Sequence, residues 1–234
     1  AKQALSDREL AAKKMLGSAN SINIARLIPQ TLYYFYTSKL VSNPLFIVPS
    51  GNFGNITAGL IAQKMGMKCS GFVAATNSND VVPAYLISGH YNPRESVQTL
   101  SNAMDVGAPS NMARIQDMAA GEVSTIRKMF TSYAVNDVDT VSSMQELYSD
   151  YNYIACPHTA VGYHVSKNIS VQSGVPKVIL ATAHPAKFPE VVKSAISIDV
   201  EVPDYLAGCL TKEKNAFSIA PNYAELREYL DNLE

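Results

Sequence analysis

The stretch Ser50–Asn55 has residue types and spacing that could do chemistry. It reads S-G-N-F-G-N, follows the apolar run Leu45–Val48 and precedes a segment with helical spacing. Glycine lets a ligand approach the backbone closely, and a helix N-terminus offers free N–H groups and a positive dipole end. The pattern predicts an anion site suited to a phosphate monoester, although a tight structural turn would also explain it. It matches neither the Walker A nor the G-x-G-x-x-G fingerprint.

Two further turns carry histidines and a lysine. His158 lies in C-P-H-T-A-V-G, and His184 and Lys187 lie in A-H-P-A-K-F. The imidazoles could serve acid–base chemistry or shape turns through hydrogen bonds. No carboxylate or cysteine stands at metal-ligand spacing from them, so we predict no metal site. Lys187 could bind an anion or form a Schiff base, and Thr182 could donate to a ring nitrogen or cap a helix.

The composition is that of an ordinary globular protein. The chain has 234 residues, 47% of them hydrophobic and 17% charged, with a net charge of -1. This balance gives no electrostatic reason to expect nucleic acid or an acidic membrane surface as a partner. No apolar run approaches the roughly 20 residues of a membrane span. Cys69, Cys156 and Cys209 are far apart and odd in number, which predicts free thiols in a reducing cytoplasm.

Segments with helical and strand-like patterns alternate along the chain, and they must position these turns. We expect strands at 45–48, 71–75, just before Cys156, and at 177–181. We expect helices at 1–16, 22–40, 56–65 and 81–88, two within 110–132, and others from 159, from 189 and over 223–230. This order predicts an α/β fold with a mostly parallel sheet and helices on both faces. Ligands bind beyond the carboxyl ends of such strands, so the turns 50–55, 76–80 and 182–187 should lie near one another. The turn 156–159 joins them if the strand before it forms.

Several motifs together resemble the threonine synthases of bacteria and fungi. They are "NSINIARLIPQTLYYFY", "VPSGNFGNITAGLIAQKMG", "ATNSNDVVPAYLISGHYNPRESVQTLSNAMDVGAPSNMAR", "PHTAVGYH" and "ATAHPAKF". They run through nearly the whole chain in the family's order. The resemblance implies a fold like that of tryptophan synthase β-type enzymes and the cofactor pyridoxal 5'-phosphate (PLP). It also implies conversion of O-phospho-L-homoserine and water into L-threonine and phosphate.

The same resemblance implies roles for particular residues. The PLP phosphate would be held by Gly51, Asn52, Phe53 and Gly54, with Asn55 at the helix entrance. Thr182 would face the pyridine nitrogen, and a neutral hydroxyl there leaves the ring a weaker electron sink. Residues assigned loosely to the substrate cleft are Asn20, Ser21, Asn23 and Arg26. His158 and Lys187 are candidates for the substrate's phosphate or for site geometry.

The chain departs from the family pattern in two places. Cys156 stands where the family usually has Asp, which weakens any role for His158 that needs an orienting carboxylate. The Ser-Phe-Lys-Asp motif with the family's Schiff-base lysine does not occur in the sequence. We therefore expect residues 1–234 to be a partial PLP-binding large domain of a longer enzyme, without its N-terminal domain. Alone it should be inactive and should self-associate through surface that the missing part would cover.

Two other functions fit the same residues. One is another PLP enzyme of this fold, such as a serine or threonine dehydratase or a cysteine synthase. The other is a non-catalytic module that binds a phosphorylated small molecule or a nucleotide, since a phosphate cradle without a lysine can still bind.

Overall fold

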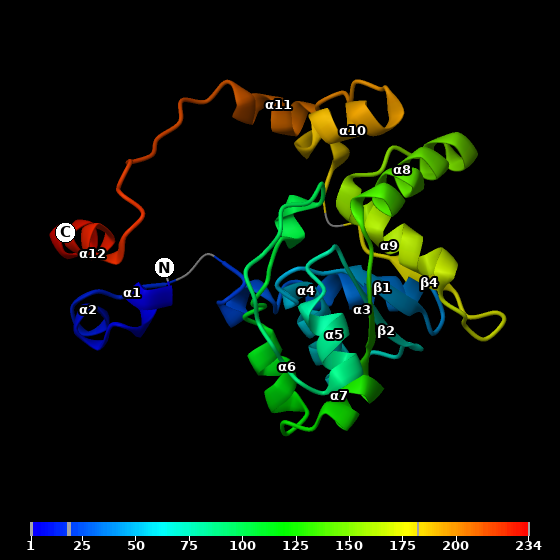
Figure 1. Cartoon of the computed structure of the whole chain (residues 1–234), viewed down its shortest axis with the longest axis horizontal. Coiled ribbons are helices and arrows are strands. Elements are labelled where there is room, and N and C mark those ends of the chain that lie inside the picture. The colour runs from blue at the N-terminus through cyan, green and yellow to red at the C-terminus, as the bar shows by residue number, and fades with distance from the viewer. Residues whose placement is uncertain (1, 18–19, 182, 234) are drawn as a thin grey trace.

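A four-stranded parallel sheet forms the centre of the protein (Figure 1). The structure, a computed structural model, describes residues 2–17, 20–181 and 183–233. Its strand order is β3-β2-β1-β4. The strands are β1 (Leu45–Pro49), β2 (Gly71–Thr76), β3 (Thr131–Ala134) and β4 (Lys177–Ile179). Because every pair is parallel, the carboxyl ends of all four strands lie at one edge.

Helices connect and cover these strands. Before β2 the helices are α1 (Lys2–Ser6), α2 (Arg8–Lys13), η1 (Ile24–Arg26), α3 (Thr31–Leu40) and α4 (Gly54–Lys64). Between β2 and β4 they are α5 (Val81–Ser88), η2 (Asn102–Met104), α6 (Met112–Met118), α7 (Val123–Met129), α8 (Asp137–Tyr151) and α9 (Pro157–Asn168). After β4 they are η3 (Pro185–Lys187), α10 (Pro189–Ile196), α11 (Asp204–Leu210) and α12 (Tyr223–Asn232).

Alternate residues of β1 point into two different cores. Phe46 and Val48 pack on the face covered by α3, α4 and α5. Leu45 and Ile47 pack on the opposite face, against α9. Successive side chains of a strand point to opposite faces, and all of β1 is buried. This confirms the predicted α/β fold with a parallel sheet that is covered on both sides.

Two helices differ from the prediction: one is divided in two, and the other begins later than expected. The helix expected over 1–16 divides at Asp7, whose carboxylate accepts hydrogen bonds from the backbone of Glu9 and Leu10 and starts α2. An N-cap carboxylate favours a new helix at that point. The helix expected over 22–40 begins at Thr31, because Pro29 cannot donate the hydrogen bond that a continuous helix needs there.

The strand expected just before Cys156 is absent from the described chain, so that prediction was wrong. Asn152 takes a left-handed conformation at the end of α8, with φ of 50°. The Tyr153 N–H then donates to the Leu147 carbonyl at 3.0 Å, which is the hydrogen bonding of a helix C-cap. The backbone polar groups of this segment are thus used to end α8. The sequence analysis also missed β3, α8 and α11.

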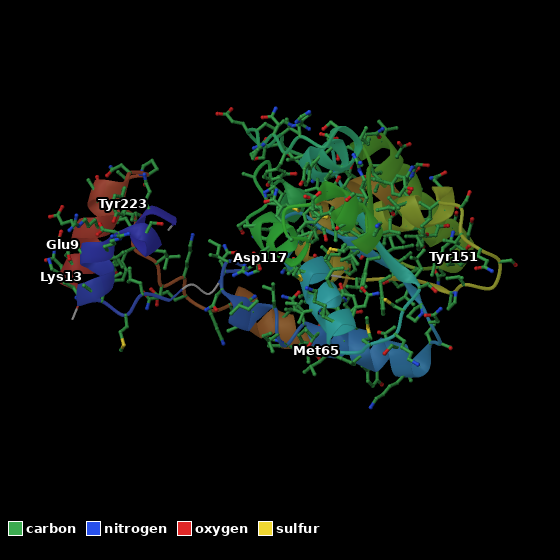
Figure 2. All side chains as sticks on the ribbon, turned by 90° about the horizontal axis from the view of Figure 1, so that it is seen from below. Glu9, Lys13, Met65, Asp117, Tyr151 and Tyr223 are labelled. Carbon is green, nitrogen blue, oxygen red and sulfur yellow. The ribbon has the colours of Figure 1, made fainter. Side chains whose placement is uncertain are left out.

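The helices from the two ends of the chain pack together, apart from the sheet (Figures 1 and 2). We call α1, α2 and α12 the terminal helix group. The Tyr223 hydroxyl donates to the Asp7 carboxylate at 2.6 Å, and Arg227 pairs with Glu9 at 2.6 Å. Leu10 is fully buried between these helices. Figure 2 shows Glu9 and Tyr223 in this group, well separated from the body of the molecule.

None of the helices within the described ranges combines the length and the apolar character that crossing a bilayer requires.

Candidate functional site

The turn after β1 has a fixed and unusual backbone. Phe53, the residue before α4, adopts a left-handed conformation with φ of 58° and ψ of 18°. This conformation is uncommon for a residue with a side chain. The Phe53 ring is 2% exposed and lies 6.2 Å from the ring of Phe130. Burial of a phenylalanine stabilises by about 1.5–3 kcal/mol, enough to hold the backbone in this form.

Five consecutive backbone N–H groups in this turn are free. Across the described ranges of the chain, no group accepts a hydrogen bond from the N–H of any residue from Gly51 to Asn55. The flanking groups are used: the Ser50 N–H donates to the Ala75 carbonyl and the Thr57 N–H to the Phe53 carbonyl. Free donors at the start of a helix, together with its dipole, form an anion-binding site.

The Asn52 side chain ties the turn to two other segments. Its Oδ1 accepts from the N–H of Ser110 at 2.6 Å and from the Ser110 hydroxyl at 2.9 Å. Its Nδ2 donates to the Ser21 hydroxyl at 2.5 Å. Asn111 Nδ2 in turn donates to the Asn52 carbonyl at 2.9 Å. These bonds leave the Asn52 N–H free and fix the loop around it.

Asn55 fixes the entrance of α4. Its side-chain oxygen accepts from the Ser50 hydroxyl at 2.7 Å, and its Nδ2 donates to the Pro49 carbonyl at 2.7 Å. The buried Tyr34 hydroxyl donates to the Asn55 carbonyl at 2.8 Å. The side chain of Asn55 is therefore occupied in joining β1 to α4, while its N–H has no acceptor within the described ranges.

The Asp105 carboxylate organises the loop that faces the turn. Asn77 Nδ2 and Thr99 Oγ1 donate to its Oδ1 at 2.8 and 2.7 Å, and the Thr99 N–H donates to its Oδ2 at 3.0 Å. Asn79 Nδ2 also reaches Oδ1, at 3.2 Å. Asn77 and Asn79 follow β2, so the turn at 76–80 converges on the site as predicted. We call residues 97–106 the facing loop.

The facing loop joins the glycine turn to His158. Met104 lies against Gly51, where a β-carbon would come within 2.5 Å of the Met104 Cα atom. Next to it, the Ala103 N–H donates to His158 Nε2 at 3.2 Å. The turns at 50–55 and 156–159 thus lie near one another, with the facing loop between them, although the strand on which that expectation depended is absent from the described chain.

His158 is buried and neutral. Its pKa is lowered to about 4, mainly by burial; the Asp105 carboxylate raises the pKa, and the Lys187 cation lowers it. Since Nε2 accepts a hydrogen bond, the proton of the neutral ring is on Nδ1, which has no partner within the described chain. The Phe188 ring centroid lies 4.6 Å from that of His158. At neutral pH the ring can therefore accept and donate hydrogen bonds but carries no charge.

The other predicted site residues have varied surroundings. Ser21 contacts Asn52, and its N–H donates to Asn20 Oδ1 at 2.6 Å. Asn23 caps η1 by accepting from the Ala25 N–H at 3.0 Å. Arg26 in η1 and Lys187 in η3 are exposed, and His184 Nδ1 caps η3 by accepting from the Ala186 N–H. Thr182 lies outside the described residues.

Cys156 acts as a helix cap and not as a partner of His158. Its sulfur accepts from the Thr159 N–H at 3.5 Å at the start of α9. The thiol is 1% exposed. The three cysteines are free, and no cluster of three or more metal-ligating side chains was found where the structure describes the chain.

Several residues that shape the site were not singled out from the sequence. They are Met104, Asp105, Ser110 and Asn111. The first three lie within residues 89–110, where the sequence predicts a loop with short elements, and Asn111 follows directly. The density of Asn, Ser and Asp in that loop was the available signal, because such side chains hold irregular backbone in place through local hydrogen bonds.

Comparisons with known proteins agree over nearly the whole chain. The family model "Threonine synthase, C-terminal" matches residues 159–230. The threonine synthase of Serratia marcescens is 40% identical in an alignment of 237 positions, which covers 99% of this chain and 54% of that protein. The crystal structure of the Escherichia coli threonine synthase superposes on this chain with a TM-score of 0.88 and 38% sequence identity. The match covers 99% of this chain and 54% of the E. coli chain.

The structure of PLP-bound threonine synthase from Brucella melitensis is 30% identical, with a TM-score of 0.85, over 98% of this chain and 55% of that one. The chain thus spans about half the length of the curated relatives it matches. The glycine turn, the helix that follows it and the order of the motifs all lie within the matched region. Over nearly its whole length the chain is similar to threonine synthases, and residues 159–230 match the family's C-terminal model.

Proposed function

We propose that the chain is the part of a PLP-dependent threonine synthase that holds the cofactor's phosphate. Residues 1–234 would form most of the PLP-binding large domain. The complete enzyme would convert O-phospho-L-homoserine and water into L-threonine and phosphate. We place it in the cytoplasm, because cysteines stay reduced there. The observation that carries the proposal is the set of five free N–H groups from Gly51 to Asn55 at the start of α4.

Free donors and uncharged neighbours support a phosphate monoester as the ligand of this turn. The side chains from other segments that hydrogen bond to it are neutral, namely those of Ser21, Tyr34, Ser110 and Asn111. They bond to Asn52 and Asn55 and leave the N–H groups unused. The α4 dipole adds attraction for an anion at its N-terminus.

The residues of this chain would bind and orient, and not carry out the covalent chemistry. When bound, PLP supplies an electron sink for carbanions at the substrate's carbons. The turn would hold its phosphate, and the facing loop would be fixed by Asp105 and by the neutral ring of His158. We propose Thr182 as the hydroxyl partner of the ring nitrogen, on the family resemblance alone.

The substrate cleft is proposed on the same resemblance. Of the residues assigned to it, Ser21 has the firmest support because it hydrogen bonds to Asn52 in the turn. The family's lysine motif does not occur in the printed sequence. We therefore propose that this chain alone binds PLP without turning over O-phospho-L-homoserine.

A comparison of PLP with pyridoxal, which lacks the phosphate, tests the proposed site. We expect the chain to bind PLP at least about tenfold more tightly, measured by absorbance titration, because only PLP engages the turn. Asn52→Ala should remove most of this preference, since the turn loses its ties to Ser21 and Ser110. Asn168→Ala, at an exposed asparagine of α9, is the matched control. Equal affinity of the wild-type chain for the two compounds would disprove the site.

A further inference from the structure

Arg114 in α6 joins two segments that lie far apart in the sequence. One terminal nitrogen of its guanidinium donates to Asn111 Oδ1 at 2.7 Å, and the other donates to the Ile22 carbonyl at 2.6 Å. A guanidinium is planar and presents its donors as a rigid fork, so it holds its two acceptors at a fixed separation. Arg114 forms no ion pair with a carboxylate of the described residues. Its polar contacts therefore hold an amide and a backbone carbonyl in place.

Asn111 extends this contact to the glycine turn. Its side chain is fully buried, and its Nδ2 donates to the Asn52 carbonyl at 2.9 Å and to the Ser21 carbonyl at 3.3 Å. Because two carbonyls face Nδ2 and a cation faces Oδ1, the amide has one favourable orientation. The cation also polarises the amide and strengthens Nδ2 as a donor. The hold of Asn111 on the turn therefore depends on the group bound to its Oδ1.

These bonds set the direction of two free donors in the turn. The peptide bonds of the turn are trans, and in a planar trans peptide the N–H points opposite to the carbonyl. Since Asn111 holds the Asn52 carbonyl, the Phe53 N–H points away from Asn111. The Phe53 carbonyl accepts from the Thr57 N–H at 3.1 Å and from the Thr57 hydroxyl at 2.6 Å. The Gly54 N–H therefore points out of the N-terminus of α4, and an anion would lie on the side of the turn opposite Asn111.

The same contacts hold the segment 20–26 against the turn. The Ser21 hydroxyl accepts from Asn52 Nδ2 at 2.5 Å. The carbonyls of the two successive residues at 21 and 22 are the acceptors of Asn111 and Arg114. The turn and this segment, to which the substrate cleft is assigned, are therefore parts of one hydrogen-bonded unit.

We propose that Arg114 is a positioning residue that couples the phosphate turn to the segment 20–26. It touches neither the phosphate nor the substrate. Through Asn111 it aims the Phe53 N–H at the phosphate, and through its own fork it holds the segment beside the turn. The inference rests on the proposed function, because it takes the PLP phosphate as the anion of the turn. Coupling between two sites is reciprocal, so phosphate binding also stabilises the segment.

Hydrogen exchange without PLP tests the coupling. Arg114→Gln keeps a neutral donor but not the fork, so the hydrogen-bonded amides of the segment 20–26 should exchange at least about fivefold faster, through local opening. Arg127→Gln is the matched control, because Arg127 likewise donates to two backbone carbonyls, those of Leu86 and Ile87 at 2.6 and 3.0 Å. It should leave the exchange of the segment unchanged. Equal exchange in the two variants would overturn the coupling.

The ratio of the affinities for PLP and pyridoxal tests the positioning role. Arg114→Gln should lower this ratio at least about fivefold, and Arg127→Gln should not. Adding Arg114→Gln to Asn111→Ala should lower the ratio no further, because Arg114 acts on the turn through Asn111. Arg114→Lys keeps the charge without the fork and should resemble Arg114→Gln. Wild-type behaviour of Arg114→Lys would assign the effect to charge alone and overturn the positioning role.

The two assays separate this inference from the function on which it rests. If the wild-type chain binds PLP and pyridoxal equally, the phosphate site and the role of Arg114 toward it both fail, while the exchange assay still decides the coupling. If the wild-type chain prefers PLP and Arg114→Gln keeps that preference, the phosphate site stands and the positioning role is overturned.

Discussion

The backbone of Met104 packs directly on Gly51, at a separation that excludes any side chain at position 51. An added β-carbon would lie 2.5 Å from the Met104 Cα atom and 3.1 Å from its carbonyl carbon. These are backbone atoms, which cannot move aside by a change of rotamer. The facing loop and the glycine turn therefore depend on each other for their positions.

Gly51→Ala is expected to lower the free energy of unfolding by about 1–3 kcal/mol, the usual cost of overpacking. It should also reduce the preference for PLP over pyridoxal, because the turn must shift. Urea denaturation and absorbance titration measure the two effects. Gly208→Ala is the control, since no atom lies within 4 Å of its added carbon. If both variants unfold at the same urea concentration as the wild type, the described contact is wrong.

His158 should make the protein less stable in mild acid. Its pKa is about 4 in the folded state and about 6.5 in an unfolded chain. Below pH 6.5 the unfolded state therefore binds more protons, so the contribution is complete above pH 6.5 and is lost as the pH falls toward 4. Between pH 7 and pH 5 this group should remove roughly 2 kcal/mol from the free energy of unfolding.

Urea denaturation at the two pH values measures this loss, and His158→Gln should remove it. His90→Gln, at an exposed imidazole, should keep the slope of the wild type. An NMR titration that places the His158 midpoint near 6.5 would contradict the burial on which the prediction depends.

Asp105→Asn should loosen the facing loop. The carboxylate accepts hydrogen bonds from Asn77, Asn79 and Thr99, and hydrogen bonds to a charged group each contribute about 1.5–3 kcal/mol. We expect a loss of at least about 2 kcal/mol and faster hydrogen exchange over residues 97–106. Asp199→Asn breaks an exposed pair with Lys193 and should change stability by less than about 1 kcal/mol. Unchanged exchange in Asp105→Asn would rule out its organising role.

Borohydride reduction should yield no single modified lysine. Lys187 is exposed in η3, and the sequence has no Ser-Phe-Lys-Asp motif. Reduction of the chain with PLP should therefore give scattered, substoichiometric pyridoxyl-lysine, mapped by peptide mass spectrometry. One stoichiometric adduct at Lys187 together with threonine formation would show that this lysine is the catalyst.

Leu10→Ala should release the terminal helix group without unfolding the sheet. Leu10 is fully buried, and leucine-to-alanine changes in a core cost about 2–5 kcal/mol. A group held by a few helical turns has little stability to spare. Hydrogen exchange should speed up in α1, α2 and α12 and stay constant in β1. Met15→Ala, at a fully exposed side chain, is the control, and equal exchange in both variants would contradict the described packing.

The sequence predicted an element correctly where an apolar or helical pattern is bounded by residues that end regular structure. Leu45–Val48 is a short apolar run between Asn43-Pro44 and the glycine turn, and it forms β1 within one residue of the expected bounds. Val81–Ser88 forms α5 as predicted, ended by Gly89 in a left-handed conformation. Here local propensity and tertiary packing favour the same structure.

The rest depended on contacts that no local pattern encodes. β3 is a short and mostly exposed strand at the edge of the sheet, so it has no buried run to mark it. Phe53 is left-handed because distant packing holds its ring. Asp105 lies between a 3₁₀ turn and irregular backbone, and its partners come from 6 to 28 residues away. The strand, turn and helix around residues 50–55 could be predicted, but the loop that packs against the turn could not.

The order of the strands bears on how the chain reaches this structure. Leu45 pairs with Gly71 on one side but with Lys177 on the other, roughly 130 residues later. Bringing together two strands so far apart in the sequence costs conformational entropy before any contact between them can stabilise the structure. The β1–β2–α4 unit, with the glycine turn, can therefore condense early, while β4 docks last. During synthesis this edge of β1 stays bare until Lys177–Ile179 emerge, which leaves it open to aggregation or to a chaperone.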